Sequence, residues 1–255
     1  GEYLFHAGGC VSCHVSEVAV PGPALLGGGL AMETDFVTFH VPNISPDPVH
    51  GIGAWSTLDF INAMNKGVSP DGRHYYPAFP YASYARMRLE DVVDLKAYLD
   101  TLPAVGKGNA DHALKFPWNI RRGIGLWKLV NLDGQAVVKG LREDPMTRRG
   151  QYLVEGPGHC GECHTPRDWT GGLDLQHWLA GAPDPEGEGR VPNITPSGLQ
   201  GWSQGDIAYY LESGFTPDFD TVGGSMVKVQ KNMAKLPARD LDAIAAYLKA
   251  IPPLD

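Results

Sequence analysis

The chain of 255 residues has no long hydrophobic run and only four cysteines. A helix that crosses a bilayer needs about 18 or more apolar residues in a row, and no stretch of this sequence approaches that length. The formal net charge of −8 argues against nucleic acid as a partner and permits a basic protein partner. No signal sequence is visible before Cys10, and we expect any targeting segment or anchor to have been removed.

The few cysteines fall into two identical patterns. "HAGGCVSCHV" covers residues 6–15 and "PGHCGECHTP" covers residues 157–166. Cys-x-x-Cys-His is typical of covalent haem attachment, because two thiols on one helical turn can add to the porphyrin vinyl groups while the next imidazole reaches the iron from the same face. We therefore predict two haem c groups. Their proposed anchors and proximal ligands are Cys10, Cys13 and His14, and Cys160, Cys163 and His164.

Other uses of the cysteines fit less well. A zinc ribbon needs a second cysteine pair about 15–20 residues further on, whereas 146 residues separate Cys13 from Cys160. A thioredoxin-like couple needs a βαβ context, which the sequence does not show. A disulfide would leave the two repeated histidines without a role. Because covalent attachment of haem takes place in an oxidising compartment, the bacterial periplasm is the expected location.

The two patterns belong to a longer internal repeat. Segments of the first 101 residues return 147 to 150 positions later, which indicates two related modules that differ by small loop changes. Each module is predicted to hold three short helices. The second helices are predicted to follow Ser56 and Ser203 as caps and to end at Gly67 and Gly214. The third helices are amphipathic, and the apolar stripe of the last one consists of Leu241, Ile244, Tyr247 and Leu248. The matching segments are "GEYL" and "GQYL", "VPNIS" and "VPNIT", "GIGAWSTLDF" and "GLQGWSQGDI", and "LEDVVDLKAYL" and "ARDLDAIAAYL".

The iron of an electron-transfer haem usually takes a methionine sulfur opposite its histidine. In the second module, "GGSMVKVQKNMAKL" places Met226 ahead of the last helix, and we predict Met226 as that ligand, with Met233 as a packing residue. In the first module the equivalent positions are Pro77, Ala78 and Phe79, none of which ligates iron.

Three arrangements stay open for the first iron. Met87 reaches it after a loop rearrangement, His74 reaches it, or the iron is five-coordinate; we favour Met87. The other reading of Met87 is a buried apolar residue at the start of the last helix, and that of His74 is a surface loop residue.

Several further residues are candidates for the haem pockets. Asn43 and Asn193 lie in the repeated "PNI" and are predicted to fix each pocket, through hydrogen bonds near the propionates or the ligand sulfur or through packing. Trp55 and Trp202 are predicted to pack on the haem edges with the indole N–H directed at a propionate, or simply to fill the core. The haem propionates need donors, and the basic segment 102–149 between the modules offers Arg121 and Arg122.

At the level of whole motifs, the chain resembles the cytochrome c subunits of membrane-associated bacterial alcohol and gluconate dehydrogenases. The resemblance rests on "GGCVSCH", "VPNISPDP", "GIGAWS", "DGRHYYPAFPY" and "DLKAYLDTLPAV" in the first half, and on "GHCGECHTPR", "GGSMVKV" and "IAAYLKAIPP" in the second. In that family the loop often reads Pro-Ala-Met-Pro-Tyr with methionine as the ligand, and Phe79 replaces it here. Those subunits commonly carry three haems and a C-terminal anchor, so the resemblance does not extend to the partner enzyme.

The resemblance implies an all-α fold of two tandem class I cytochrome c-like domains, related by duplication. We expect the domains at 1–101 and 150–255, with 102–149 as a connector packed between them. The expected function is that of a periplasmic di-haem electron carrier between a donor dehydrogenase and a terminal acceptor, an oxidase or a small cytochrome of a respiratory chain. The expectation includes a membrane-associated complex, formed through a partner or through a removed N-terminal segment. The alternatives are a di-haem peroxidase or sulfur-compound oxidoreductase that reacts at an open first haem, and a gas sensor.

Overall fold

The computed structural model describes residues 1–16, 24–33, 37–141, 143–184 and 189–255. They form two compact units, one of residues 1–5 and 10–133 and one of residues 6–9 and 134–255. The division falls inside the segment that the sequence suggests as a connector, so that 102–133 goes with the first unit and 134–149 with the second.

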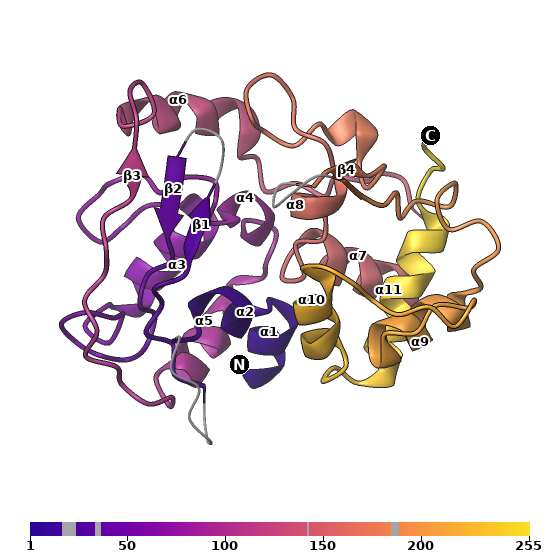
Figure 1. The fold of residues 1–255 in the computed structure, drawn as a ribbon, viewed down its shortest axis with the longest axis horizontal. Coiled ribbons are helices and arrows are strands. Elements are labelled where there is room, and N and C mark those ends of the chain that lie inside the picture. Colours follow the sequence, from indigo (N-terminus) through magenta and orange to yellow (C-terminus); the bar gives the residue numbers. More distant parts are fainter. Residues whose placement is uncertain (17–23, 34–36, 142, 185–188) are drawn as a thin grey trace. The chain divides into compact units, whose positions relative to one another are not determined.

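The first part of the chain carries short helices and one small sheet (Figure 1). Strands β1, β2 and β3 pair in that order and antiparallel, with Met32 opposite Phe39 and Val37 opposite Leu114. The elements are α1 (Glu2–Ala7), α2 (Cys10–His14), β1 (Ala31–Glu33), β2 (Val37–His40), α3 (Thr57–Lys66), α4 (Tyr81–Tyr84), α5 (Leu89–Leu99), β3 (Ala113–Leu114) and α6 (Arg122–Asn131).

The second part follows a similar helical order. The elements are α7 (Pro145–Glu155), α8 (Gly161–His164), the 3-10 turn η1 (Leu175–His177), β4 (Ala182–Pro183), β5 (Arg190–Val191), α9 (Gln204–Ser213), α10 (Met226–Met233) and α11 (Ala238–Ala250). The short strands β4 and β5 pair antiparallel. Helices dominate, but the expectation of an all-α chain is wrong in this detail, because loop backbone pairs into short strands where it needs hydrogen-bond partners.

Helices α3 and α9 begin and end as the sequence predicts. The Ser56 hydroxyl accepts a hydrogen bond from the backbone N–H of Asp59, whose carboxylate accepts from the Ser56 backbone, and Gly67 ends α3 in the left-handed region at φ 58°. Ser203 and Gly214 take the same roles in α9. Such caps satisfy the backbone groups that a helix end leaves without partners.

The turns that follow these caps also correspond. An isolated bridge pairs Val68 with His74 in the first unit, and another pairs Phe215 with Thr221 in the second. Phe215 follows Val68 by 147 positions, and Thr221 follows His74 by the same number. The two halves therefore share backbone geometry as well as sequence at this point.

A close approach of two helices recurs as well. In the second unit α7 lies against α11 (Figure 1), and a Cβ added at Gly150 would stand 1.9 Å from the Ala243 carbonyl oxygen and 2.7 Å from the Tyr247 Cβ. In the first unit a Cβ at Gly1 would stand 2.2 Å from the Asp94 carbonyl oxygen of α5. Only glycine allows backbones to approach this closely.

The core of the first unit joins residues from its helices and from the loops between them. Its buried members are Leu4, Phe5, Leu26, Ile52, Phe60, Met64, Tyr84, Met87, Val92, Leu95 and Leu99. In the second unit α11 packs on both α7 and α9. The predicted apolar stripe of α11 is buried along its length, with Leu241, Ile244, Tyr247 and Leu248.

Candidate functional site

The first Cys-x-x-Cys-His pattern forms a helix of its own. Cys10, Cys13 and His14 all lie on α2, directly after Gly9 with φ 57°. A separation of three residues places both thiols on one face of a helical turn. All four cysteines lie in the described part of the chain and none forms a disulfide. Burial raises the pKa of the Cys10 thiol to about 12, which disfavours a thiolate role in the polypeptide itself.

The second pattern is built around a contact that sequence reasoning did not foresee. Cys160 precedes α8, and burial raises the pKa of its thiol to about 12 as well. A Cβ added at Gly161 would stand 2.1 Å from the indole ring of Trp178, so that only glycine fits at position 161. Trp178 is buried, and its ring supports the turn that carries Cys160 and Cys163.

Both pattern histidines are held in the same way. The Nδ1 atom of His14 lies 2.8 Å from the carbonyl oxygen of Pro42, and that of His164 lies 2.8 Å from the carbonyl oxygen of Pro192. Burial lowers the pKa of both imidazoles. The lowered pKa favours the neutral form, and a neutral imidazole that donates from Nδ1 leaves the lone pair of Nε2 available to a metal. Two thiols and an oriented imidazole are a donor set that fits haem c.

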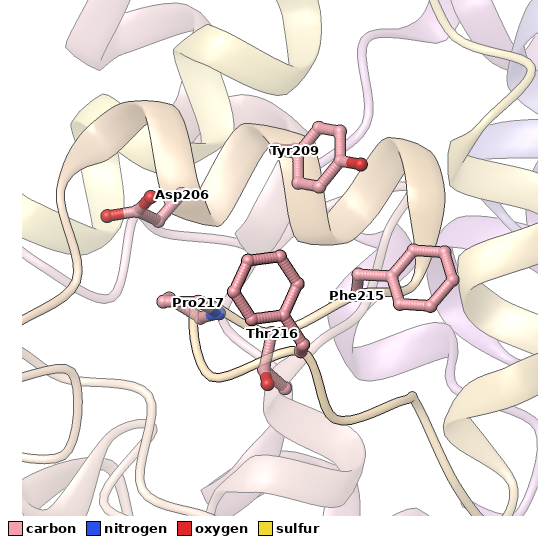
Figure 2. Close-up of a pocket in the computed structure, with 6 residues that line it drawn as sticks. Asp206, Tyr209, Phe215, Thr216 and Pro217 are labelled. Atoms are coloured by element: carbon pink, nitrogen blue, oxygen red, sulfur yellow. The ribbon is translucent and has the colours of Figure 1, made fainter.

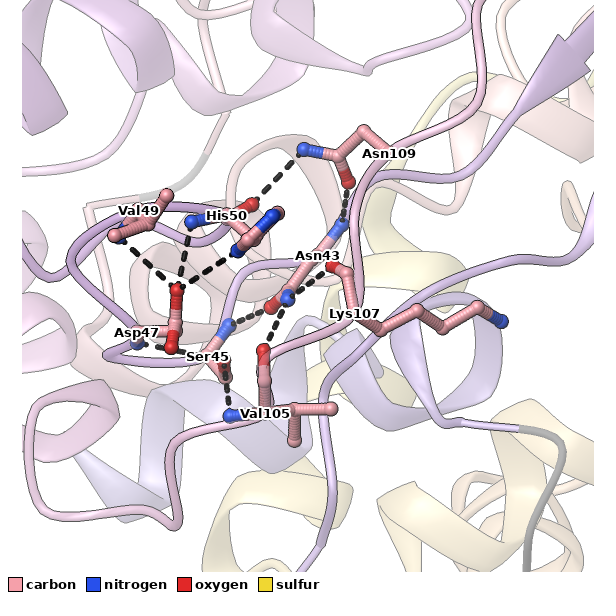
Figure 3. A network of polar contacts seen from close by, with 8 residues as sticks. All are labelled: Asn43, Ser45, Asp47, Val49, His50, Val105, Lys107 and Asn109. Atoms are coloured by element: carbon pink, nitrogen blue, oxygen red, sulfur yellow. Dashed lines mark hydrogen bonds and ion pairs between the residues drawn. The ribbon is translucent and has the colours of Figure 1, made fainter.

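A polar network holds the Pro42 loop in place (Figure 3). The side-chain amide of Asn43 donates to the carbonyl oxygens of Val105 at 2.6 Å and Lys107 at 2.9 Å, and its oxygen accepts from the backbone N–H of Ser45. Both N–H groups of the amide are thus used within the protein, on the carbonyl groups of the segment that follows α5. Asn43 fixes the loop that presents the Pro42 carbonyl to His14.

Asn193 does the same in the second unit with different partners. Its amide donates to the carbonyl oxygen of Leu254 at 2.6 Å, and its oxygen accepts from the backbone and the hydroxyl of Thr195. In both units, therefore, the Asn of "PNI" ties the loop next to the proline carbonyl to the segment after the last helix. The spacing of the repeat predicted a pocket role, and only the fold shows these partners.

The two tryptophans of the repeat are half-buried. Trp55 packs against the core cluster of the first unit. Trp202 meets the ring of Tyr210 edge to face, with centroids 5.5 Å apart.

The basic connector uses Arg121 within the protein. The guanidinium of Arg121 lies 4.8 Å from the ring centre of Tyr76 and donates to the His74 carbonyl oxygen, while Arg122 is exposed at the start of α6.

The candidate thioether ligand of the second unit stands at the start of a helix. Met226 is the first residue of α10 and is half-buried. Met233, at the other end of α10, is buried. Helix α10 begins shortly after the Phe215–Thr221 bridge, which aligns with the Val68–His74 bridge at a separation of 147 residues. At the same separation, Met226 aligns with Phe79.

An aromatic cluster occupies the corresponding place in the first unit. Phe79 meets the rings of Tyr75, Tyr81 and Tyr84 edge to face, with centroids 5.7 to 6.2 Å apart. Met87, with only 5% of its surface exposed, follows this cluster and belongs to the core of the unit. Its backbone N–H bonds to the carbonyl of Tyr84.

His74 is engaged elsewhere. Its Nδ1 atom lies 3.1 Å from the Nζ atom of Lys128, and its ring packs against Gly125 of α6. Burial lowers the pKa of the imidazole, with the Lys128 charge as the second cause. This arrangement disfavours His74 as an iron ligand.

The lysine beside His74 was not anticipated from the sequence. Lys128 is buried and donates to the carbonyl oxygens of Lys66 and Gly67, both at 2.6 Å, at the end of α3. The second unit uses Gln230 for this purpose, on the last carbonyl groups of α9. The negative end of α3 attracts the Lys128 ammonium group, but burial outweighs this attraction and lowers its pKa to about 8.

A buried carboxylate in the second unit was also missed. Glu155 is almost fully buried, and its oxygens accept from the hydroxyl of Tyr247 at 2.7 Å, from the Gln151 amide at 3.0 Å, and from the backbone N–H groups of residues 137 and 138. The indole N–H of Trp178 donates in turn to the Tyr247 hydroxyl at 3.0 Å. This network links α7, α11 and the brace of the second Cys-x-x-Cys-His turn.

The comparisons with known proteins agree with this donor set. The cytochrome c family matches residues 1–103. The chain is 53% identical to a di-haem c-type cytochrome of Cereibacter sphaeroides over 256 residues, which cover 100% of this chain and 86% of that protein. It is 35% identical to the fructose dehydrogenase cytochrome subunit of Gluconobacter japonicus and 37% identical to the gluconate 2-dehydrogenase cytochrome c subunit of Pantoea cypripedii. It spans only 52% and 58% of those two subunits.

Fold and site thus define a haem-binding electron-transfer protein. The chain belongs to the cytochrome c family, among its di-haem members, and carries two covalently bound haem c groups. The predicted resemblance to the cytochrome c subunits of dehydrogenases is confirmed. Within the described residues, no helix is both long and apolar enough to pass through a bilayer.

Proposed function

We propose that each haem c is fastened by its own Cys-x-x-Cys-His turn. The observation that supports this proposal is the repeated bond of 2.8 Å between a histidine Nδ1 and a proline carbonyl, because it leaves both Nε2 atoms directed to a metal. When bound, the haem supplies a one-electron couple at its iron. The proposed anchors are Cys10, Cys13, Cys160 and Cys163, and the proposed proximal ligands are His14 and His164.

We further propose that the chain is a tandem duplication of a class I cytochrome c-like module, with modules at 1–101 and 150–255. The equivalent caps, bridges and glycine contacts of the two halves support it. The connector 102–149 then contributes to both modules, since 102–133 clusters with the first unit and 134–149 with the second.

Met226 and Met87 are the proposed sixth ligands. Replacing Met226 by Ala should turn one haem high-spin and lower its reduction potential, because the thioether stabilises ferrous iron. Met233→Ala is the matched control, since Met233 lies on the same helix but is buried as a packing residue. Absorption and EPR spectra with a redox titration measure the change. A Met226→Ala protein with both haems low-spin would refute the assignment.

Met87→Ala tests the first haem in the same way. Met64 belongs to the same core cluster and is buried to a similar degree, so Met64→Ala removes comparable apolar volume. The expected result is a high-spin first haem in Met87→Ala alone. The same spectrum in both variants, or a high-spin first haem in the wild type, would sink the Met87 proposal.

The pocket residues have supporting roles in this proposal. Asn43 and Asn193 hold the loops whose carbonyl groups orient the two histidines, and Trp55 and Trp202 line the haem edges. Loosening these loops would let the imidazoles turn away from the metal.

We propose that the protein is a periplasmic electron carrier between a donor dehydrogenase and an acceptor, an oxidase or a small cytochrome. The names of its relatives, cytochrome subunits of fructose, gluconate and alcohol dehydrogenases, support this proposal. In this role the chain makes and breaks no substrate bond; its residues hold and orient the two haems. The test is reduction of the purified protein by a quinone-dependent dehydrogenase with its sugar or alcohol substrate.

A second candidate function rests on Phe79, which stands where the other unit has its methionine. An open first haem would suit a peroxidase, a sulfur-compound oxidoreductase or a gas sensor. Carbon monoxide added to the reduced protein separates the readings. An unchanged spectrum supports electron transfer alone, and rapid stoichiometric binding at one haem supports the second candidate.

A further inference from the structure

An exposed aromatic hollow lies on the second unit, between α9 and the loop 215–221. The hollow has a volume of about 360 Å³. It is lined by Asp206, Tyr209, Phe215, Thr216, Pro217 and Phe219. Figure 2 shows Asp206 and Tyr209 projecting from the helix, and Phe215 and Pro217 from the loop that faces it. Three aromatic side chains are exposed at one place, Phe219 with 90% of its surface. Grouped exposed apolar side chains mark interaction sites more often than single ones do.

The first unit has the same loop without the aromatic residues. The N–H of Thr216 bonds to the carbonyl of Asp220 at 2.9 Å, as the N–H of Ser69 bonds to that of Arg73 at 2.9 Å. At the shared separation of 147 residues, the aromatic positions 209, 215 and 219 correspond to Asn62, Val68 and Gly72. The scaffold of the loop therefore does not require aromatic side chains.

The backbone conformation of Phe219 also indicates a functional role for the loop. Phe219 has φ 63° and Gly72 has φ 81°, so both lie in the left-handed region. Glycine adopts this region without strain, whereas a bulky side chain there is an outlier. The second unit thus keeps a strained, almost fully exposed phenylalanine where its counterpart has the residue that the turn favours. Strain of this kind gathers at functional sites.

The charges around the loop differ as well. In the first unit Asp71 forms an ion pair with Arg73. In the second unit the corresponding residues are both acidic, Asp218 and Asp220, and neither forms an ion pair with a described residue. Glu212 and Asp206 add two further carboxylates without an ion-pair partner among the described residues, and hydrogen bonds from Ser203 lower the pKa of Asp206.

The hollow also lies close, along the chain, to the proposed ligand of the second haem. The loop closes where the N–H of Val222 bonds to the carbonyl of Gly214 at 2.8 Å. Met226 follows Val222 by four positions, at most about 14 Å of extended chain. A protein bound at the loop would therefore be near the second haem pocket.

We propose that this surface, named here the aromatic loop patch (Tyr209, Phe215 and Phe219 with Asp206, Glu212, Asp218 and Asp220), docks a protein partner. The partner presents an apolar side chain surrounded by Lys or Arg. The aromatic rings offer an apolar contact, and the four carboxylates attract positive charge. That this partner is a redox protein rests on the proposed function. The inference that the patch docks a protein rests on the exposed aromatic rings and the carboxylates alone.

The test uses the residues of the first unit as replacements. In the triple variant Tyr209→Asn, Phe215→Val, Phe219→Gly, each aromatic residue is replaced by the residue at the aligned position of the first unit. The first unit forms the same loop with these residues. The control is Trp169→Ala, because Trp169 is another exposed aromatic residue of this unit, with 96% of its surface exposed. A second variant, Asp218→Asn with Asp220→Asn, removes charge only. The holoprotein is used throughout, with a lysine-rich small c-type cytochrome as the probe.

Binding of the probe is measured by surface plasmon resonance at low and moderate ionic strength. The aromatic variant is expected to lose about tenfold or more in affinity, and the charge variant to lose both affinity and salt dependence. The control should bind as the wild type does. Unchanged haem spectra show that each variant is folded.

Several outcomes would overturn the proposal. These are wild-type protein that does not bind the probe, equal binding by the aromatic variant, and binding to phospholipid vesicles that depends on Phe219. Self-association in sedimentation experiments that Phe219→Gly abolishes would assign the patch to a second copy instead. Reversible reduction of both haems is scored separately, so that the electron-transfer function can stand while the docking proposal fails.

Discussion

Replacing Gly150 by Ala tests the packing of α7 on α11 most directly. In an ordinary helix interior this change stabilises by about 0.5–1 kcal/mol, since alanine has less backbone freedom to lose on folding. Here the new methyl group would stand 1.9 Å from the carbonyl oxygen of Ala243 and 2.7 Å from the Cβ of Tyr247. Both are fixed atoms of a buried helix, so the two helices must separate. Overpacking of this kind costs roughly 1–3 kcal/mol, and we expect a net destabilisation of about 1–2 kcal/mol.

Gly205→Ala is the matched control. Gly205 lies in the first turn of α9, and the nearest atom to an added Cβ is the Ser203 hydroxyl at 3.6 Å, an ordinary contact. The control should therefore gain stability, by up to about 1 kcal/mol. Guanidinium unfolding of both holoproteins, followed by circular dichroism in the haem and far-ultraviolet regions, measures the difference. A Gly150→Ala protein as stable as the wild type would refute the close helix approach.

Three further changes have expected outcomes. Tyr247→Phe should lower the free energy of unfolding by roughly 2–3 kcal/mol, because the buried N–H of Trp178 loses its acceptor, whereas Tyr98→Phe at the equivalent half-buried position should cost less; urea titrations compare the two. Lys128→Met tests a pH effect. Burial lowers the pKa of Lys128 to about 8, so between pH 8 and about 10 the unfolded chain binds more protons than the folded chain. The stability of the wild type should therefore rise with pH over this range relative to that of the variant. Unfolding is measured at about pH 7 and 9.5, and an equal change in stability in the two proteins would contradict the expectation. Asn43→Ala removes the amide donor of two part-buried hydrogen bonds, to the carbonyl groups of Val105 and Lys107, and should cost about 1–2 kcal/mol together with a shift in the first haem potential. Unchanged melting and an unchanged potential would show that Asn43 does not hold this loop.

Phe79 shows how far the repeat carries and where it stops. The repeat alone aligns Phe79 with Met226, and in the structure Phe79 belongs to a cluster of aromatic rings. The position of Met87 in the core could not be read from spacing, because a buried methionine and a ligand methionine have the same sequence signature. Which methionine binds iron stays a prediction.

Local patterns in the sequence determined much of this protein. The two Cys-x-x-Cys-His turns, the serine caps at 56 and 203 and the glycine ends at 67 and 214 each depend on neighbouring residues, so they are visible without a fold. The haem cofactor followed from the chemistry of the turn alone.

Only the tertiary structure decided the rest. The proline carbonyl that orients each histidine lies 28 residues away, the two carbonyl acceptors of the Asn43 amide lie more than 60 residues away, and the acceptor of the Trp178 N–H lies 69 residues away. Hydrogen bonds over such separations leave no periodic trace in a single sequence, because they depend on where the chain returns and not on what stands beside each residue. The exposed aromatic loop patch emerged for the same reason, since burial, strain and charge pairing are properties of the folded chain.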